Sequence, residues 1–137
     1  ASDTIIYKVH LMKECLERGI NMISSMGAAN KTDPTRFEIA DISKTHTDPM
    51  AKVIRNRLKR QGIRKGVKVV VSDESPIVIR EDVKETVGDK NAINRKGQIP
   101  PSSNAFVPSV VGLICASYVI NDILKDILVR RIKDKGQ

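Results

Sequence analysis

The stretch that decides the fold runs Gly19-Ile20-Asn21-Met22-Ile23-Ser24-Ser25-Met26-Gly27-Ala28-Ala29-Asn30. Ahead of it, apolar residues recur at helical spacing, which predicts a helix that ends near Arg18 at a left-handed Gly19. The apolar run over 20–25 then predicts a strand, and the small residues over 27–30 predict a loop at its carboxyl end. A helix, a glycine and a strand in this order indicate half of a βαβ unit and therefore an α/β fold.

Further along, apolar patterns and breaker residues predict several more elements. Asp48-Pro49 is a strong helix start, because aspartate caps the first turn and proline suits the first helical position. Proline and glycine punctuate residues 74–103, which predicts an irregular loop. The predicted elements are a strand over 36–43, a helix from Asp48 to Gly62, a strand over 67–71, an apolar helix from Ser103 or Asn104 to about Lys125, and an edge strand over 128–132.

The apolar segments and the cysteines favour a cytoplasmic protein without a membrane span. The longest apolar run, Ala105–Ile120, is interrupted by polar and helix-breaking residues and falls short of the ~20 residues that a span needs. We therefore expect a buried helix there. Two cysteines, Cys15 and Cys115, form neither a disulfide framework nor a zinc-ligand spacing, so we predict a reducing environment.

The net charge of +8 comes from one segment. Residues 52–68 contain eight of the 24 basic residues and none of the 16 acidic ones, so the rest of the chain is balanced. A solvated helix face is the simpler interpretation, but such faces usually mix both signs. The absence of acids favours a surface that binds the phosphate backbone of a nucleic acid. The candidate residues are Lys52, Arg55, Arg57, Lys59, Arg60, Arg64 and Lys65.

The chain begins Ala1-Ser2-Asp3-Thr4 and runs directly into the first predicted helix. A βαβ unit has a strand ahead of this helix, so we expect that strand to lie upstream of the sequence. Asp3 then stands at a strand-to-helix junction, where a carboxylate acts as a helix cap or as a magnesium ligand beside bound phosphates. Spacing alone favours the cap. The sequence contains no glycine-rich phosphate loop and no Ser/His/Asp arrangement, so the catalytic residue stays unknown.

Several motifs resemble the ubiquitin-activating enzymes and their bacterial HesA/MoeB/ThiF relatives. Residues 1–4 are similar to the Asp-containing segment that follows a buried strand in that superfamily, and residues 24–35 resemble its small-residue loop and Asp-Pro turn. The segment Asp41-Ile42-Ser43-Lys44-Thr45-His46-Thr47-Asp48-Pro49, with residues 55–59 and 72–76, resembles the tRNA threonylcarbamoyladenosine dehydratase branch. The resemblance covers nearly the whole chain, except for residues 79–98.

The resemblance implies that residues 1–137 are the C-terminal part of a single adenylating domain, with the ATP-binding half upstream. It implies a Rossmann-like α/β fold with a mixed parallel and antiparallel sheet and flanking helices. ATP and magnesium are the implied cofactors, Asp3 the implied magnesium ligand, and Gly27 an implied part of the nucleotide site. The resemblance implies no zinc, because the Cys pairs that bind structural zinc in some relatives are missing. The intact protein would be a homodimeric enzyme that adenylates and then cyclises threonylcarbamoyladenosine in tRNA, whereas this part alone would be inactive.

Two other functions stay open from the sequence. The first is an adenylyltransferase that activates the C-terminal tail of a small ubiquitin-like carrier protein. For the dehydratase itself, the resemblance also implies a sulfur-carrier or cysteine desulfurase-type protein as a partner. The cysteine that some relatives carry before the last helix is absent here, where residues 101–104 read Pro-Ser-Ser-Asn. The second is a basic RNA-binding module without catalysis. A nucleotide-binding loop upstream of Ala1 would separate an enzyme from that module.

Overall fold

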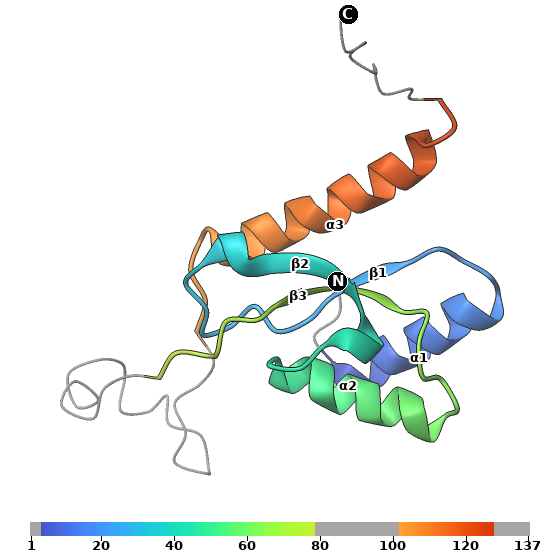
Figure 1. Cartoon of the computed structure of the whole chain (residues 1–137), viewed down its shortest axis with the longest axis horizontal. Helices are drawn as coiled ribbons and strands as arrows, with labels where there is room; N and C mark the ends of the chain where they lie inside the picture. Colours follow the sequence, from blue (N-terminus) through green and yellow to red (C-terminus); the bar gives the residue numbers. More distant parts are fainter. Residues whose placement is uncertain (1–3, 79–101, 128–137) are drawn as a thin grey trace, which may run out of the picture.

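Three strands pair in the order β1-β3-β2 in the computed structural model, which describes residues 4–78 and 102–127. β1 (Ile23–Ser25) runs parallel to β3 (Lys68–Ser72), whereas β2 (Phe37–Asp41) pairs with β3 in the antiparallel sense. In this register Val70 lies opposite Ser25 on one side and Ile39 on the other. The predicted mixed sheet is confirmed, and β3 is its central strand (Figure 1).

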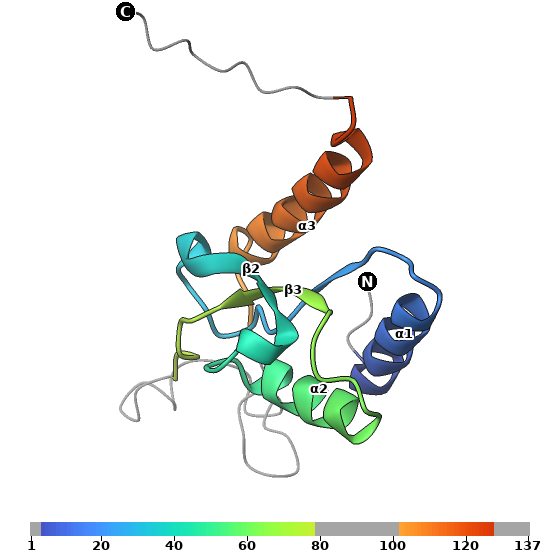
Figure 2. The same ribbon diagram turned by 45° about the vertical axis from the view of Figure 1, so that its right-hand side comes forward.

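The central strand β3 contributes to two separate cores, because successive side chains of a strand point to opposite faces. Val69 and Val71 pack in a cluster with α1 (Ile5–Glu17) and α2 (Pro49–Arg60). Val70 packs on the other face with Phe37 and the first turns of α3 (Val107–Leu124). Figures 1 and 2 show α1 and α2 on one side of the sheet and α3 on the other. Burial on both faces explains the run of three valines.

Both helices of the first layer end where the sequence predicts. Gly19 has a φ of +64° and Gly62 a φ of +82°. Each glycine directly follows the C-cap residue of its helix, which is Arg18 for α1 and Gln61 for α2. The main-chain N–H of Ile20 donates to the Cys15 carbonyl at 2.8 Å, and that of Ile63 donates to the Leu58 carbonyl at 3.0 Å. These are the bonds of a glycine-terminated helix, which satisfy carbonyls that the helix itself leaves unpaired. Both predicted glycine stops are confirmed.

The strands are shorter than the sequence predicts. The strand predicted over 20–25 covers only Ile23–Ser25, and Ile20 is 54% exposed rather than packed. The strand predicted over 36–43 covers Phe37–Asp41, because 3₁₀ turns over Pro34–Arg36 and Ile42–Lys44 replace its ends. The strand predicted over 128–132, and most of the loop predicted over 74–103, lie outside the described residues.

The apolar helix α3 is not buried, which corrects the prediction. Its first turns pack on the sheet through Val107 and Val111, which are the buried residues of the helix. Beyond them the helix continues past the sheet (Figure 2), and Leu113 and Ile123 are each 68% exposed. In the described part of the chain, α3 is the one helix that is long and apolar enough to cross a membrane by length and composition, which is weak grounds for a span.

A buried ion pair joins the loop after β1 to the start of α2. The side chains of Lys31 and Asp48 are 1% and 0% exposed, and Lys31 Nζ lies 3.5 Å from Asp48 Oδ2. The same ammonium donates to the main-chain carbonyls of Ser72 at 3.4 Å and Glu74 at 3.0 Å. Asp48 Oδ1 accepts the N–H of Ala51 at 2.8 Å and so caps α2. The pair therefore fixes the sheet end and the helix start relative to each other.

Gly27 lets this carboxylate come close to the loop after β1. A Cβ atom on Gly27 would lie 2.7 Å from Asp48 Oδ2, well inside van der Waals contact. Within the described residues, Asp48 Oδ2 is buried and accepts no hydrogen bond, so the Lys31 charge is the compensation that the structure shows for it. The packing of Gly27 against Asp48 is a structural reason for a residue without a side chain at this position.

The buried ion pair predicts that the protein loses much of its stability when the Asp48 charge is removed and the helix cap is kept. Asp48→Asn retains an oxygen that can accept the Ala51 N–H. It leaves the buried Lys31 charge uncompensated, so we expect a loss of about 3–5 kcal/mol in the free energy of unfolding. Urea denaturation measures it. Asp33→Asn is the matched control, because Asp33 caps the 3₁₀ turn from a less buried position. Equal losses in the two variants would contradict a special role for the ion pair.

The close approach at Gly27 predicts that an added methyl group destabilises the protein there, but not at a glycine with open space around it. Gly27→Ala forces the loop or the Asp48 carboxylate to move, which we expect to cost about 1–3 kcal/mol. At Gly112, in α3, a Cβ atom would meet nothing within 4 Å. Gly112→Ala should instead stabilise the helix by about 0.5–1 kcal/mol. Thermal unfolding of both variants tests the opposite signs, and an unchanged midpoint for Gly27→Ala would refute the steric argument.

Candidate functional site

A carboxylate holds the loop that follows the small residues at the end of β1. Glu74 Oε1 accepts the Thr32 N–H at 3.0 Å and the Thr32 hydroxyl at 3.1 Å, and Oε2 accepts the Asp33 N–H at 3.1 Å. Burial raises the pKa of the Glu74 carboxyl, but these hydrogen bonds outweigh it and keep that pKa below its ordinary value. This edge of an open α/β sheet is where ligands generally bind. The loop at that edge is therefore rigidly held.

Asn30 connects the same loop to two other segments. Its φ of +57° lies in the left-handed region, which asparagine tolerates better than most residues. Its main-chain N–H donates to the Ser102 carbonyl and its carbonyl accepts the Ile77 N–H, both at 2.7 Å. Its side-chain Oδ1 accepts the Ser102 N–H at 2.9 Å. Residues 30, 77 and 102 thus meet at the carboxyl end of the sheet, which no sequence pattern indicated.

Of the two residues predicted to bind the nucleotide and the metal, the structure describes Gly27 but not Asp3. Gly27 lies in the loop after β1, beside the buried Asp48 carboxylate. Asp3, the predicted magnesium ligand, lies outside the described residues. Within the described ranges, no group of three or more His, Cys, Asp or Glu side chains could hold a metal ion. Asp48 is also unsuited to that role, because its carboxylate is buried against Lys31.

The predicted basic surface surrounds α2 and the turn that follows it. Six of its seven residues are exposed, and Arg55 is half-buried. The turn is fixed by Asp41, whose Oδ2 accepts the Gly66 N–H at 2.7 Å and whose Oδ1 accepts the Ser43 N–H at 2.9 Å. Burial raises the pKa of Asp41, but these hydrogen bonds bring it below its ordinary value. An ionised carboxylate therefore positions the turn that carries Arg64.

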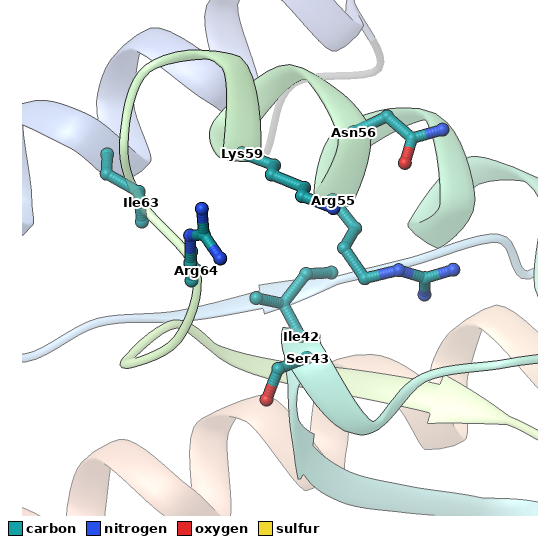
Figure 3. A pocket seen from close by; sticks show the side chains of 7 residues that line it. All are labelled: Ile42, Ser43, Arg55, Asn56, Lys59, Ile63 and Arg64. Atoms are coloured by element: carbon teal, nitrogen blue, oxygen red, sulfur yellow. The ribbon is translucent and has the colours of Figure 1, made fainter.

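One side of α2 borders a hollow of about 280 Å³ that faces the 3₁₀ turn after β2 (Figure 3). Arg55, Lys59 and Arg64 line it, together with the apolar side chains of Ile42 and Ile63. Arg55 is held in place because its Nη1 donates to both the carbonyl and the hydroxyl of Thr45. We call this the first hollow. Three cations gathered without a lining acid form a surface suited to phosphate groups.

The other side of α2 borders a second hollow, of about 460 Å³, that faces α1. Arg57 and Arg60 from the predicted surface line it, together with Gln61. His10 and Lys13 of α1 line it as well, and sequence reasoning did not assign them to any site. They were missed because α1 carries no run of basic residues. Lys52 and Lys65 line neither hollow, so the structure divides the predicted surface rather than gathering it at one point.

The chain is similar in sequence to named dehydratases, although no family model matches it. It is 70% identical to the tRNA threonylcarbamoyladenosine dehydratase of Bacillus subtilis over 135 residues, which make up 98% of this chain and 53% of that protein. It is 46% identical to tRNA threonylcarbamoyladenosine dehydratase 2 of Saccharomyces cerevisiae over 74 residues, or 54% of this chain and 17% of that protein. The chain thus spans about half the length of the Bacillus relative.

Solved structures of one such enzyme share the fold. The E. coli tRNA N6-threonylcarbamoyladenosine dehydratase TcdA matches with a TM-score of 0.71 at 22% identity, over 91% of this chain and 47% of that chain. TcdA in complex with ATP matches with a TM-score of 0.69 at 22% identity, over 92% of this chain and 46% of that chain. The predicted fold class is thus confirmed. The resemblance stated from the motifs is confirmed too: over nearly its whole length, this chain is homologous to about half of a tRNA threonylcarbamoyladenosine dehydratase.

Proposed function

We propose that this chain is the C-terminal part of an ATP-dependent enzyme that dehydrates threonylcarbamoyladenosine in tRNA. The observation that carries the proposal is the 70% identity to the Bacillus dehydratase over 98% of the chain. The solved structure of TcdA with ATP, which shares the fold, supports ATP as the co-substrate. The ATP-binding half of the domain is proposed to lie upstream of Ala1.

The proposed reaction activates a carboxylate and then closes a ring. The carboxylate of the threonylcarbamoyl group attacks the α-phosphate of ATP, and pyrophosphate leaves. A nitrogen or oxygen atom of the same threonylcarbamoyl group then attacks the activated carboxyl carbon, loses its proton as the ring closes, and AMP leaves. Such steps depend mainly on positioning and on electrostatic stabilisation of the phosphates. Asp3 is proposed to hold magnesium, which would neutralise phosphate charge when bound, and Gly27 to lie beside the nucleotide.

The described residues are proposed to supply the tRNA contacts. The seven basic residues of the predicted surface are exposed or half-buried around α2, and none of them forms an ion pair within the described part of the chain. Unpaired cations are free to neutralise phosphates and to release their counterions. The loop at the carboxyl end of β1, which Glu74 and the Lys31–Asp48 pair hold rigid, would position the modified base relative to the nucleotide.

A homodimer in the cytoplasm is also proposed. The exposed apolar side of α3, which includes Leu113, Ile120 and Ile123, is a surface that a second copy would cover. Contiguous apolar surface of this kind usually marks an interaction site. Sedimentation velocity of the full chain would test the dimer, and a monomer at all concentrations would exclude self-association through α3.

The main alternative is an enzyme that activates a ubiquitin-like or sulfur-carrier protein through a cysteine. Burial raises the pKa of the Cys115 thiol, which disfavours the thiolate that such chemistry needs. Cys15 lies half-buried on α1. Neither cysteine therefore supports a role as a nucleophile, and no observation favours this alternative over the dehydratase.

The proposal predicts different behaviour for this chain and for the longer protein. The chain alone should neither bind ATP tightly nor act on tRNA, because the proposed phosphate-binding loop lies upstream. Isothermal titration calorimetry with ATP and magnesium should detect no binding to the chain at micromolar concentrations. The longer protein should bind ATP and remove one water from threonylcarbamoyladenosine in tRNA, which mass spectrometry of the digested nucleosides measures. Micromolar ATP affinity of the chain alone would contradict the proposed division.

The basic surface predicts a change in the salt dependence of tRNA binding. Lys59→Gln and Arg64→Gln remove two exposed charges of the first hollow while keeping long polar side chains. The slope of log K against log salt should flatten by roughly 0.7–0.9 for each lost phosphate contact. Filter binding at several salt concentrations measures it.

The control for this experiment is the pair Arg18→Gln and Lys125→Gln, which changes the net charge equally. These two residues lie on other parts of the chain and pair with Glu14 and Asp122. An equal flattening in the control would show that net charge, rather than the first hollow, governs tRNA binding.

A further inference from the structure

α2 presents its basic residues on two opposite sides of an exposed ridge. At 3.6 residues per turn, Arg55 and Lys59 lie on one side of the helix, and Arg57 and Arg60 lie on the other. The first hollow opens on the side of Arg55, and the second hollow opens on the side of Arg57, against α1. The buried stripe of Ala51, Ile54 and Leu58 lies between the two sides on the core face. A strand that reaches both hollows must therefore pass over the exposed ridge.

The second hollow has the features of a phosphate site. Arg57 and Arg60, whose guanidinium groups each carry several donors, line the space together with Lys13. The described residues that line it include no acid, and His10 and Gln61 add further hydrogen-bonding groups. Val9 closes the floor, and Ile6, which is 63% exposed, offers an apolar surface beside the cations. The combination suits an anionic group that is attached to a less polar ring.

The acid that pairs with Lys13 leaves this side chain accessible. Glu17 lies 3.7 Å from Lys13 Nζ, and the two side chains are 57% and 41% exposed. Exposed helix pairs of this kind contribute about 0–1 kcal/mol, so Lys13 can exchange this partner for a phosphate at little cost. Arg57 and Arg60 form no ion pair in the described part of the chain.

We infer that the second hollow binds a backbone phosphate of RNA with its ribose, so that one RNA strand crosses α2 from the first hollow to the second. α1 thereby becomes part of the RNA-binding surface through Lys13 and His10. The inference rests on the proposed function, because it takes tRNA as the ligand of the basic surface. Beyond the proposed function, the inference gives the RNA a path across α2 and assigns RNA contacts to Lys13 and His10, which lie outside the basic segment 52–68. The helix to be crossed is about 10 Å wide, a distance that a few nucleotides span.

Lys13→Gln tests the inference when its tRNA affinity is measured with the full chain over a range of salt concentrations. We expect weaker binding and a slope that flattens by roughly 0.7–0.9, as one phosphate contact is lost. Lys125→Gln is the matched control, because Lys125 is also an exposed helix lysine that pairs with a nearby acid, at 3.2 Å. It lies on α3, away from the second hollow, so it should leave the slope unchanged.

Glu17→Gln separates a phosphate contact from a structural role of the ion pair. Both Lys13→Gln and Glu17→Gln break the pair, but only Lys13→Gln removes the cation from the hollow. We expect Glu17→Gln to keep or increase the tRNA affinity. Equal losses in both variants would overturn the inference, as would a Lys13→Gln slope equal to that of Lys125→Gln.

The two proposals fail in distinguishable ways. If the unmodified chain binds tRNA without salt dependence, the proposed tRNA contacts fail. If Lys59→Gln with Arg64→Gln flattens the slope and Lys13→Gln does not, the tRNA contacts stand and the path across α2 is wrong. If the two sets of substitutions flatten the slope additively, RNA occupies both hollows, since independent contacts contribute independent counterion release.

Discussion

The buried contact between Lys31 and Asp48 determines how the rest of the structure is arranged. Lys31 comes from the loop after β1, Asp48 caps α2, and the ammonium also binds carbonyls at the end of β3. Three segments that are distant in the sequence therefore meet at one charge. A buried pair adds little net stability compared with apolar packing, but losing one partner is costly. Its main effect is to fix where α2 starts, and with it the positions of both hollows.

Acidic and basic residues have different roles in the described part of the chain. Asp41, Asp48 and Glu74 use their carboxylates to accept main-chain N–H groups, so they hold turns and a helix start. The cations of α2 are exposed instead, apart from the half-buried Arg55, which donates to Thr45. None of these three carboxylates forms an ion pair with a cation of residues 52–68 in the part of the chain that the structure describes. The positive charge of residues 52–68 is therefore available to a partner, and the same folding contacts that position α2 also keep its surface cationic.

The sequence predicted the local features of the fold well and the long-range ones poorly. Gly19, Gly62 and Asp48-Pro49 mark helix ends because their effects act within one turn of the chain. Nothing in the sequence pairs Lys31 with Asp48, since a buried lysine is rare and its partner is set by the tertiary fold. Composition predicted the basic surface. Its division between two hollows on either side of α2, the second of them walled by α1, follows only from the way the helices pack.

Two of the three helices that flank the sheet, α2 and α3, show why apolar composition alone does not predict burial. α2 is strongly amphipathic, so its apolar stripe packs in the core and its polar side faces the solvent. α3 is apolar nearly all round, so no orientation on a single sheet buries more than one of its sides. The sheet also meets only its first turns, and 11% of the helix is buried. An apolar helix of this kind requires neighbours beyond the described sheet. Composition therefore predicted a burial that residues 4–78 and 102–127 do not provide for α3.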